Sequence, residues 1–152
     1  MSFVPLAWKA EFETGVEEID LQHRYFLRLI NRLGEELATA KDERYRQCLL
    51  DELAKYATFH FVSEENIMFK FAYPGLAEHA RLHWSLLDRL SSRATGRPVE
   101  ELLDFLTEWF AEHTTKEDHL IGEYLADTGR WASEPRDESR LGAVRKPADP
   151  DR

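Results

Sequence analysis

The stretch Ile19-Asp20-Leu21-Gln22-His23-Arg24-Tyr25-Phe26-Leu27-Arg28-Leu29-Ile30 carries the pattern that decides the fold. Apolar residues recur at helical spacing in this stretch and beyond it, at Ile19, Phe26, Ile30, Leu33 and Leu37. Such spacing places them on one face of an amphipathic helix. Because aspartate is a common residue at helix N-caps, the pattern predicts a helix over 20–39 that begins at Asp20.

Three further helices follow the first one. The same periodicity predicts helices over 43–70, over 76–93 and from Pro98, as the first helical residue, to about Tyr124. Polar, proline and glycine residues separate them, and Asp42 is expected to cap the second helix. The sequence therefore predicts an all-α, antiparallel up-down-up-down four-helix bundle. Three helices with a disordered end form a weaker alternative, because the last helix is as periodic as the others.

The bundle is expected to occupy residues 1–126, including an N-terminal arm over 1–19 with a turn at Thr14-Gly15. After Ala126 the composition becomes charged and rich in proline. Residues 127–152 are therefore expected to form a polar, flexible C-terminal tail. A chain of 152 residues has room for one core of ordinary size.

Charge and composition exclude several classes of protein. The 20 Lys and Arg residues against 29 Asp and Glu give a net charge of −9, whereas nucleic-acid and anionic-membrane surfaces need positive charge. No secretory signal and no apolar run of about 18 residues is recognisable. The single cysteine, Cys48, suits a reducing compartment. We therefore expect a soluble, cytoplasmic protein.

Polar residues interrupt the apolar stripes of all four predicted helices. They are His23, His60, Glu64, His79, His83, His113 and Asp118. Residues four apart lie on one face of a helix, so the second and third helices each present a pair that can reach a shared centre. Asp118 follows His113 by five residues. It reaches the same centre only if the helix loosens, for instance through a π-type bulge near 114–117.

Metal coordination accounts for these residues together. Burying five imidazoles and two carboxylates without a partner costs several kcal/mol for each charged group. The set offers nitrogen and oxygen donors, and it exceeds the four ligands of a single tetrahedral zinc. The His-Glu-x-x-His motif of zinc proteases and the Glu-x-x-His motif of ferritin-like di-iron proteins are both absent. Imidazole-rich sites with some carboxylate suit iron.

A pair of metals also predicts room for one external ligand. Two octahedral metals offer about twelve coordination positions, and the seven side chains with one bridging hydroxide leave one position open. Apolar side chains are expected to surround this position, namely Phe26, Leu106, Trp109 and Phe110. A reduced di-iron centre of this kind takes one small diatomic molecule.

Several motifs resemble those of the bacterial hemerythrins. They are Thr14-Gly15-Val16-Glu17-Glu18-Ile19-Asp20-Leu21-Gln22-His23, His60-Phe61-Val62-Ser63-Glu64-Glu65, Tyr73-Pro74, His79-x-x-x-His83 and His113-x-x-x-x-Asp118. The resemblance covers the chain from about Trp8 to Leu125, and the motifs stand in the family's order. The five-residue spacing after His113 is the family's own pattern.

The resemblance implies a non-haem di-iron centre with a bridging oxo or hydroxo group, in a four-helix bundle. It implies that His79, His83 and His113 hold one iron, that His23 and His60 hold the other, and that Glu64 and Asp118 bridge them. Dioxygen is then expected to bind at the iron with two histidines. The protein contributes a dry, shaped pocket around it.

Two residues depart from the family's pattern. Thr114 follows His113 where many bacterial members carry an aliphatic residue, and its hydroxyl is expected to lie near the ligand pocket. There it can hydrogen-bond the bound molecule or admit water. His119 follows Asp118 where lysine is common, and we expect it to face solvent because the ligand set is complete without it.

The leading hypothesis is a protein without enzymatic activity that binds dioxygen reversibly, for storage, delivery or sensing. We expect a monomer or a weak homo-oligomer, with an unknown client protein. The alternative is a di-iron enzyme that reduces peroxide, nitric oxide or nitrite, which Thr114 keeps open. A signalling module with a phosphate-accepting histidine is disfavoured, because such a histidine must be exposed and five of the six lie on apolar stripes.

Overall fold

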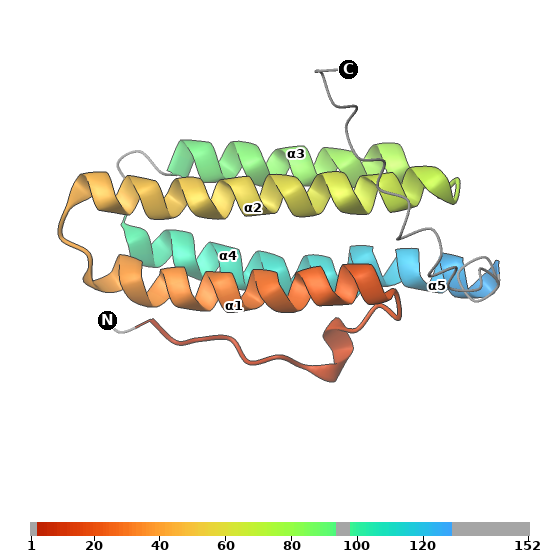
Figure 1. The fold of residues 1–152 in the computed structure, drawn as a ribbon, viewed down its shortest axis with the longest axis horizontal. Helices are drawn as coiled ribbons and strands as arrows, with labels where there is room; N and C mark the ends of the chain where they lie inside the picture. Colours follow the sequence, from red (N-terminus) through yellow and green to blue (C-terminus); the bar gives the residue numbers. More distant parts are fainter. Residues whose placement is uncertain (1–2, 94–97, 129–152) are drawn as a thin grey trace, which may run out of the picture.

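The computed structural model describes residues 3–93 and 98–128, and within these ranges it consists of helices without strands (Figure 1). The elements are η1 (Ala10–Phe12), α1 (Glu17–Thr39), α2 (Glu43–Lys70), α3 (Leu76–Arg93), α4 (Val99–His113), the π-helical segment η2 (Thr114–Asp118) and α5 (His119–Asp127). Because α4, η2 and α5 follow one another without a break, they form one long helix. The predicted all-α four-helix bundle is confirmed.

The helices pack as two pairs, α1 with α4 and α2 with α3 (Figure 1). The packing between α1 and α2 joins the two pairs. The core between them is apolar over most of its length and includes Phe26, Leu53, Leu86, Leu106 and Phe110, each about 1–2% exposed. No helix within the described part of the chain is long and apolar enough to cross a membrane.

The predicted bounds of α2 and α3 are confirmed at both ends. Asp42 caps α2 as expected, since its carboxylate accepts a hydrogen bond from the backbone N–H of Tyr45 at 3.0 Å. Pro98 was expected to be the first residue of the last helix, but α4 begins at Val99 and Pro98 is its N-cap. Of the predicted polar tail, only Asp127 and Thr128 lie within the described residues.

The prediction that Asp20 caps the first helix was wrong, because α1 begins at Glu17. The carboxylate of Asp20 points back toward the loop before the helix. It accepts hydrogen bonds from the backbone N–H of Thr14 at 2.7 Å, the hydroxyl of Thr14 at 2.7 Å and the backbone N–H of Gly15 at 3.1 Å. Asp20 therefore holds the predicted turn at Thr14-Gly15, where Gly15 has a φ of 86°.

The N-terminal arm runs along the bundle next to α1 (Figure 1). Asn31 of α1 pairs with Leu6 of the arm through two hydrogen bonds of 2.9 Å. The backbone N–H of Leu6 donates to Oδ1 of Asn31, and Nδ2 of Asn31 donates to the carbonyl oxygen of Leu6. Phe12 is fully buried and meets the ring of Phe110 edge to face, with ring centroids 5.4 Å apart. The arm therefore closes the side of the core that lies between α1 and α4.

Candidate metal centre

All seven candidate ligands meet in the interior of the bundle, and each is 6% exposed or less. Four helices supply them: His23 from α1, His60 and Glu64 from α2, His79 and His83 from α3, and His113 and Asp118 from the long helix that α4, η2 and α5 form. Each ligand continues the apolar stripe of its helix. The periodicity that buries the core therefore also brings these polar side chains together.

The π-helical segment η2 brings Asp118 to the cluster. On a regular α-helix, a residue five positions after His113 is turned about 140° away from it. In η2 the wider helical turn cancels this rotation, and Nε2 of His113 lies 3.0 Å from Oδ1 of Asp118. The predicted π-type bulge is confirmed.

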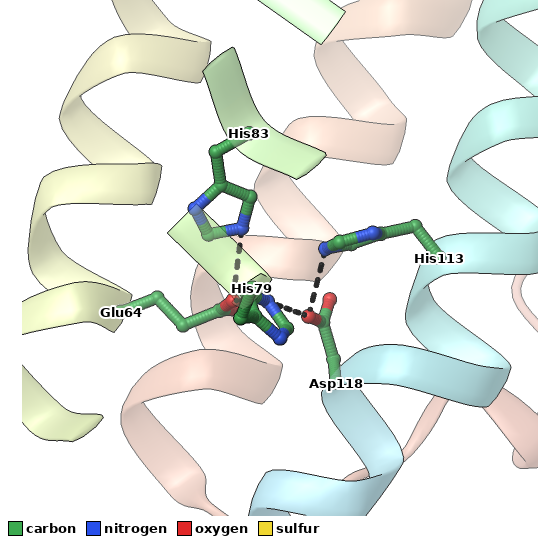
Figure 2. A group of neighbouring side chains, drawn as sticks. All are labelled: Glu64, His79, His83, His113 and Asp118. Carbon is green, nitrogen blue, oxygen red and sulfur yellow. Dashed lines mark hydrogen bonds and ion pairs between the residues drawn. The ribbon is translucent and has the colours of Figure 1, made fainter. Parts of the chain in front are cut away.

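The seven side chains form two groups of donor atoms that share both carboxylates. In one group the three imidazoles of His79, His83 and His113 surround Glu64 and Asp118 (Figure 2). Nε2 of His79 lies 2.8 Å from Oε1 of Glu64 and 3.0 Å from Oδ1 of Asp118. Nε2 of His83 lies 3.2 Å from the same Glu64 oxygen. We call these residues the three-histidine group.

The other oxygen of each carboxylate faces the second group, which His23 and His60 complete. Nε2 of His23 lies 3.0 Å from Oδ2 of Asp118 and 3.6 Å from Oε2 of Glu64, and Nε2 of His60 lies 3.4 Å from that Glu64 oxygen. We call this the two-histidine group. Because Glu64 and Asp118 each turn one oxygen to each group, they have the arrangement of bridging ligands between two metal ions.

Ion pairs between these groups move their pKa values strongly. Burial raises the pKa of Glu64, but the histidines around its two oxygens outweigh burial and hold this pKa well below its usual value. Burial lowers the pKa of His23, but the carboxylates of Asp118 and Glu64 raise it to about 9. The same two carboxylates raise the pKa of His79 to about 10 against its burial. Both carboxylates are therefore ionised at neutral pH, and His23 and His79 are protonated in the metal-free protein.

Besides Nδ1 of His23, four buried atoms of the cluster make no hydrogen bond of regular geometry in the described part of the chain, although the ion-pair distances above bring charged atoms close to them. They are Oε2 of Glu64, Nε2 of His83, Nε2 of His113 and Oδ1 of Asp118. An unsatisfied buried polar atom costs about 1–3 kcal/mol. All four atoms belong to the two donor groups, so metal ions held there would satisfy them. The residues present fit a pair of metal ions with nitrogen and oxygen ligands.

Aromatic rings pack on the imidazoles from outside. Trp109 stacks on His113, with centroids 4.4 Å apart and planes 13° apart, and Phe61 stacks on His83 at 3.9 Å and 9°. The ring centroids of Phe26 and His60 lie 5.9 Å apart. Phe61 was not among the residues that the sequence predicted around the centre. Its contact could not be expected from spacing, because it depends on how α2 faces α3.

The remaining residues expected around the ligand pocket are all buried. Phe110 lies 6.0 Å from the ring of His23, Leu106 belongs to the adjoining core, and Thr114 is 2% exposed. His119 turns outward as predicted, with 46% of its side chain exposed, and lies 3.4 Å from Glu123.

The outer nitrogens of two imidazoles have partners that were not among the predicted site residues. Nδ1 of His60 lies 2.8 Å from Oε1 of Gln22, and Nδ1 of His83 lies 3.3 Å from Oε2 of Glu65. Gln22 and Glu65 each stand next to a ligand in the sequence, which was the signal available. Such partners orient metal-ligating histidines and fix their tautomers.

Loading of a divalent metal is expected to release protons and to tighten as the pH rises. His23 and His79 must lose their protons to bind metal, and their pKa values of about 9 and about 10 mean that both are charged at pH 7. Apparent affinity should therefore rise by about tenfold per pH unit for each proton displaced, up to that range. Calorimetric titrations with Co²⁺ in buffers of different ionisation enthalpy measure the number of protons released. An affinity that does not change between pH 6 and 9 would contradict this prediction.

The metal-free protein is expected to show the opposite pH dependence. The ion pairs of His23 and His79 stabilise the fold fully below the ordinary histidine pKa of 6.5, and this contribution is lost as the pH rises through about 9 and about 10. Thermal unfolding of the metal-free protein should therefore move to lower temperature between pH 7 and 10.

Comparison with known proteins identifies the family. The model of the hemerythrin HHE cation binding domain matches residues 14–125. The chain is 30% identical over 122 residues to bacteriohemerythrin of Clostridium acetobutylicum, which covers 73% of this chain and 94% of that protein. It is 31% identical over 129 residues to bacteriohemerythrin of Methylococcus capsulatus, with 80% and 97% covered.

A relative from an animal and a solved structure agree with this assignment. Hemerythrin subunit beta of Lingula anatina is 32% identical over 115 residues, which covers 76% of this chain and 91% of that protein. A crystal structure of wild-type hemerythrin superposes with a TM-score of 0.72 and 28% identity, covering 79% of this chain and 97% of the other. The chain thus belongs to the hemerythrin HHE cation-binding family.

Proposed function

We propose that this protein binds dioxygen reversibly at a non-haem di-iron centre. The observation that carries the proposal is the pair of donor groups that share Glu64 and Asp118. His79, His83 and His113 would hold one iron, and His23 and His60 the other. Two ferrous ions bound there would supply the two electrons that reversible dioxygen binding needs.

The unequal number of histidines supports a single binding position for dioxygen. The two-histidine group offers one imidazole fewer than the three-histidine group, while both use the same two carboxylates. The open position is therefore assigned to the two-histidine group. Phe26 and Phe110 pack against its imidazoles and exclude water from that side. Leu106 and Trp109 would complete the apolar surroundings of the centre, and Thr114 would add a hydroxyl group to them.

We also propose that the protein is a carrier or store in the cytoplasm and has no enzymatic activity of its own. The relatives bear the name hemerythrin, which favours binding of dioxygen over reduction of peroxide, nitric oxide or nitrite. Cys48 is exposed and unpaired, which suits a reducing compartment. A monomer or weak homo-oligomer is proposed, and the charge of −9 argues against nucleic acid as a partner.

Counting iron and cycling oxygen test the proposed function. The reduced protein is expected to hold two irons per chain, and air is expected to produce a charge-transfer absorption band that disappears under argon and returns with air over several cycles. A chain that holds only zinc, or only one metal ion, would overturn the proposal. Bleaching in the first cycle together with fast turnover of peroxide would favour the enzyme instead.

Thr114 is expected to shorten the lifetime of the oxygen-loaded protein. It is buried and directly follows His113, and we propose that its hydroxyl lies near the bound dioxygen, where it would add a hydrogen-bonding group to otherwise apolar surroundings. The oxygen-loaded form of Thr114→Ile, and of the nearly isosteric Thr114→Val, should therefore lose its bound dioxygen irreversibly as peroxide, which would leave the ferric protein, several times more slowly. The decay of the charge-transfer band measures this.

Thr115→Val provides the matched control. Thr115 lies in the same π-helical segment, but its hydroxyl already donates a hydrogen bond of 2.7 Å to the carbonyl of Ala111. This variant should decay at the parent's rate. Equal lifetimes in the parent and both Thr114 variants would show that the hydroxyl has no part in the oxidation.

A further inference from the structure

We propose that Gln22 is a positioning residue that fixes the tautomer of His60 and limits how strongly this imidazole donates electrons to the metal of the two-histidine group. The proposal rests on the proposed function, since it concerns the same centre. Gln22 does not touch the position of the metal itself. It acts through the outer nitrogen of His60, which lies 2.8 Å from its side-chain oxygen.

The partners of Gln22 determine which way its amide points. Its Nε2 lies 3.1 Å from a carboxylate oxygen of Glu18 and 2.8 Å from the hydroxyl oxygen of Ser63. A carboxylate only accepts hydrogen bonds, so the NH₂ group must face Glu18 and the carbonyl oxygen must face His60. The Nδ1 atom of His60 therefore carries the proton and donates it. This leaves the lone pair of Nε2 directed into the two-histidine group, 3.4 Å from Oε2 of Glu64.

The surroundings of Gln22 hold it in this orientation. Gln22 is 8% exposed and lies on α1 where this helix packs on α2. The hydroxyl of Tyr56 donates a hydrogen bond of 2.7 Å to its backbone carbonyl, and Ser63 fixes its amide from the same helix as His60. Tyr56, His60 and Ser63 all belong to α2, so Gln22 links the two helices at the level of the centre.

The neutral charge of Gln22 distinguishes His60 from His83. His83 has the carboxylate of Glu65 at its Nδ1, whereas Nδ1 of His23 has no hydrogen-bond partner in the described part of the chain. A carboxylate at this position draws the proton away and makes the ligand more basic, and an amide does so much less. A weaker donor favours ferrous over ferric iron. Gln22 therefore helps to keep the oxygen-binding side of the centre reduced.

Two substitutions of Gln22 and one matched control test the inference. Gln22→Glu keeps the shape and the acceptor oxygen, adds a negative charge and replaces the NH₂ group that faces Glu18 and Ser63 with an oxygen. Gln22→Leu removes the acceptor. Gln47→Glu is the control, because Gln47 is an exposed residue of α2 where the same change of charge lies far along the helix from the ligands. The measurements are the midpoint potential of the iron-loaded protein, the affinity for Co²⁺ in competition with a chelator, and thermal unfolding of the metal-free forms.

Gln22→Leu is expected to weaken binding at one of the two metal positions by about 10- to 100-fold. Gln22→Glu should retain both metals, lower the midpoint potential and oxidise faster in air, and Gln47→Glu should match the parent. If Gln22→Leu does not fold, the potential of Gln22→Glu decides the question alone. Parent-like potential and affinity in the Gln22 variants, or lower stability without a change in potential, would overturn the positioning role. Failure of the parent to hold two irons would instead overturn the proposed function.

Discussion

Glu64→Ala is expected to abolish binding of both irons. Glu64 touches four of the five histidines, with distances from 2.8 to 3.6 Å between its oxygens and their Nε2 atoms, and it belongs to both donor groups. Loss of this one side chain would therefore remove a ligand from each of the two proposed metal positions at once. Replacement of His23 or His60 would remove a ligand from one proposed position only, so metal analysis should find the other position still occupied.

The metal-free form of Glu64→Ala should also be less stable than the metal-free parent. Removing one partner from a buried group of charges costs about 3–5 kcal/mol, because the remaining charges stay buried without compensation. Iron analysis and urea unfolding measure the two effects separately. Glu123→Ala is the control, since Glu123 is 58% exposed and its pair with His119 contributes little. Two irons in Glu64→Ala would contradict the bridging assignment.

Gly122→Ala is expected to destabilise the fold by about 3 kcal/mol, at the upper end of the usual cost of overpacking. A Cβ atom at position 122 would lie 1.9 Å from the backbone carbonyl oxygen of Thr14, which cannot rotate away as a side chain can. The collision would separate α5 from the loop that precedes α1. Asp118 stands one turn before Gly122 in the same helix. On the other side of the collision, Thr14 is hydrogen-bonded to Asp20, which lies close to His23 in the sequence. Weaker retention of iron should therefore accompany the loss of stability.

Gly34→Ala is the matched comparison, because Gly34 is also a buried glycine within a helix. The three atoms nearest to a Cβ there all belong to the ring of Phe3, the closest at 2.6 Å, and this ring belongs to the N-terminal arm and can swing aside. The higher helix propensity of alanine, about 1 kcal/mol, offsets part of the lost packing. Free energies of unfolding in urea should therefore differ little between Gly34→Ala and the parent. Equal stability of Gly122→Ala and Gly34→Ala would show that the loop at Thr14 moves without cost.

The helices and the candidate ligands could be predicted because one pattern encodes both. His23, His60 and His113 replace apolar residues in stripes that must face the interior, so locating the stripes also locates the histidines. The position of Asp118 could be inferred despite its irregular spacing. One π-helical turn between His113 and Asp118 is a local change, and it is sufficient to bring the two side chains together. These inferences needed only the geometry of individual helices.

Contacts between elements could not be predicted in the same way. Asp20 was predicted as an N-cap because a carboxylate near a helix start usually accepts hydrogen bonds from the backbone N–H groups that follow it. Here the N–H groups that donate to Asp20 belong to Thr14 and Gly15, which precede it. Gln22 lies beside the apolar stripe, and its role depends on the register of α1 against α2. The stacking of Phe61 on His83 depends likewise on how two helices are rotated against each other.

The π-helical segment η2 has a consequence for the whole fourth helix. Its extra residue shifts the angular phase of everything that follows by about 100°. Upstream, Leu102, Leu106 and Phe110 join the large apolar cluster, whereas downstream Ile121 and Leu125 join a separate small cluster with Val16 and Met68. A designed bundle made of ideal straight helices lacks this extra residue, so copying the ligands alone could not reproduce the centre. In this chain the same effect would follow from deleting one residue from 114–117, which would rotate Asp118 away from the centre and turn Ile121 and Leu125 out of the second cluster.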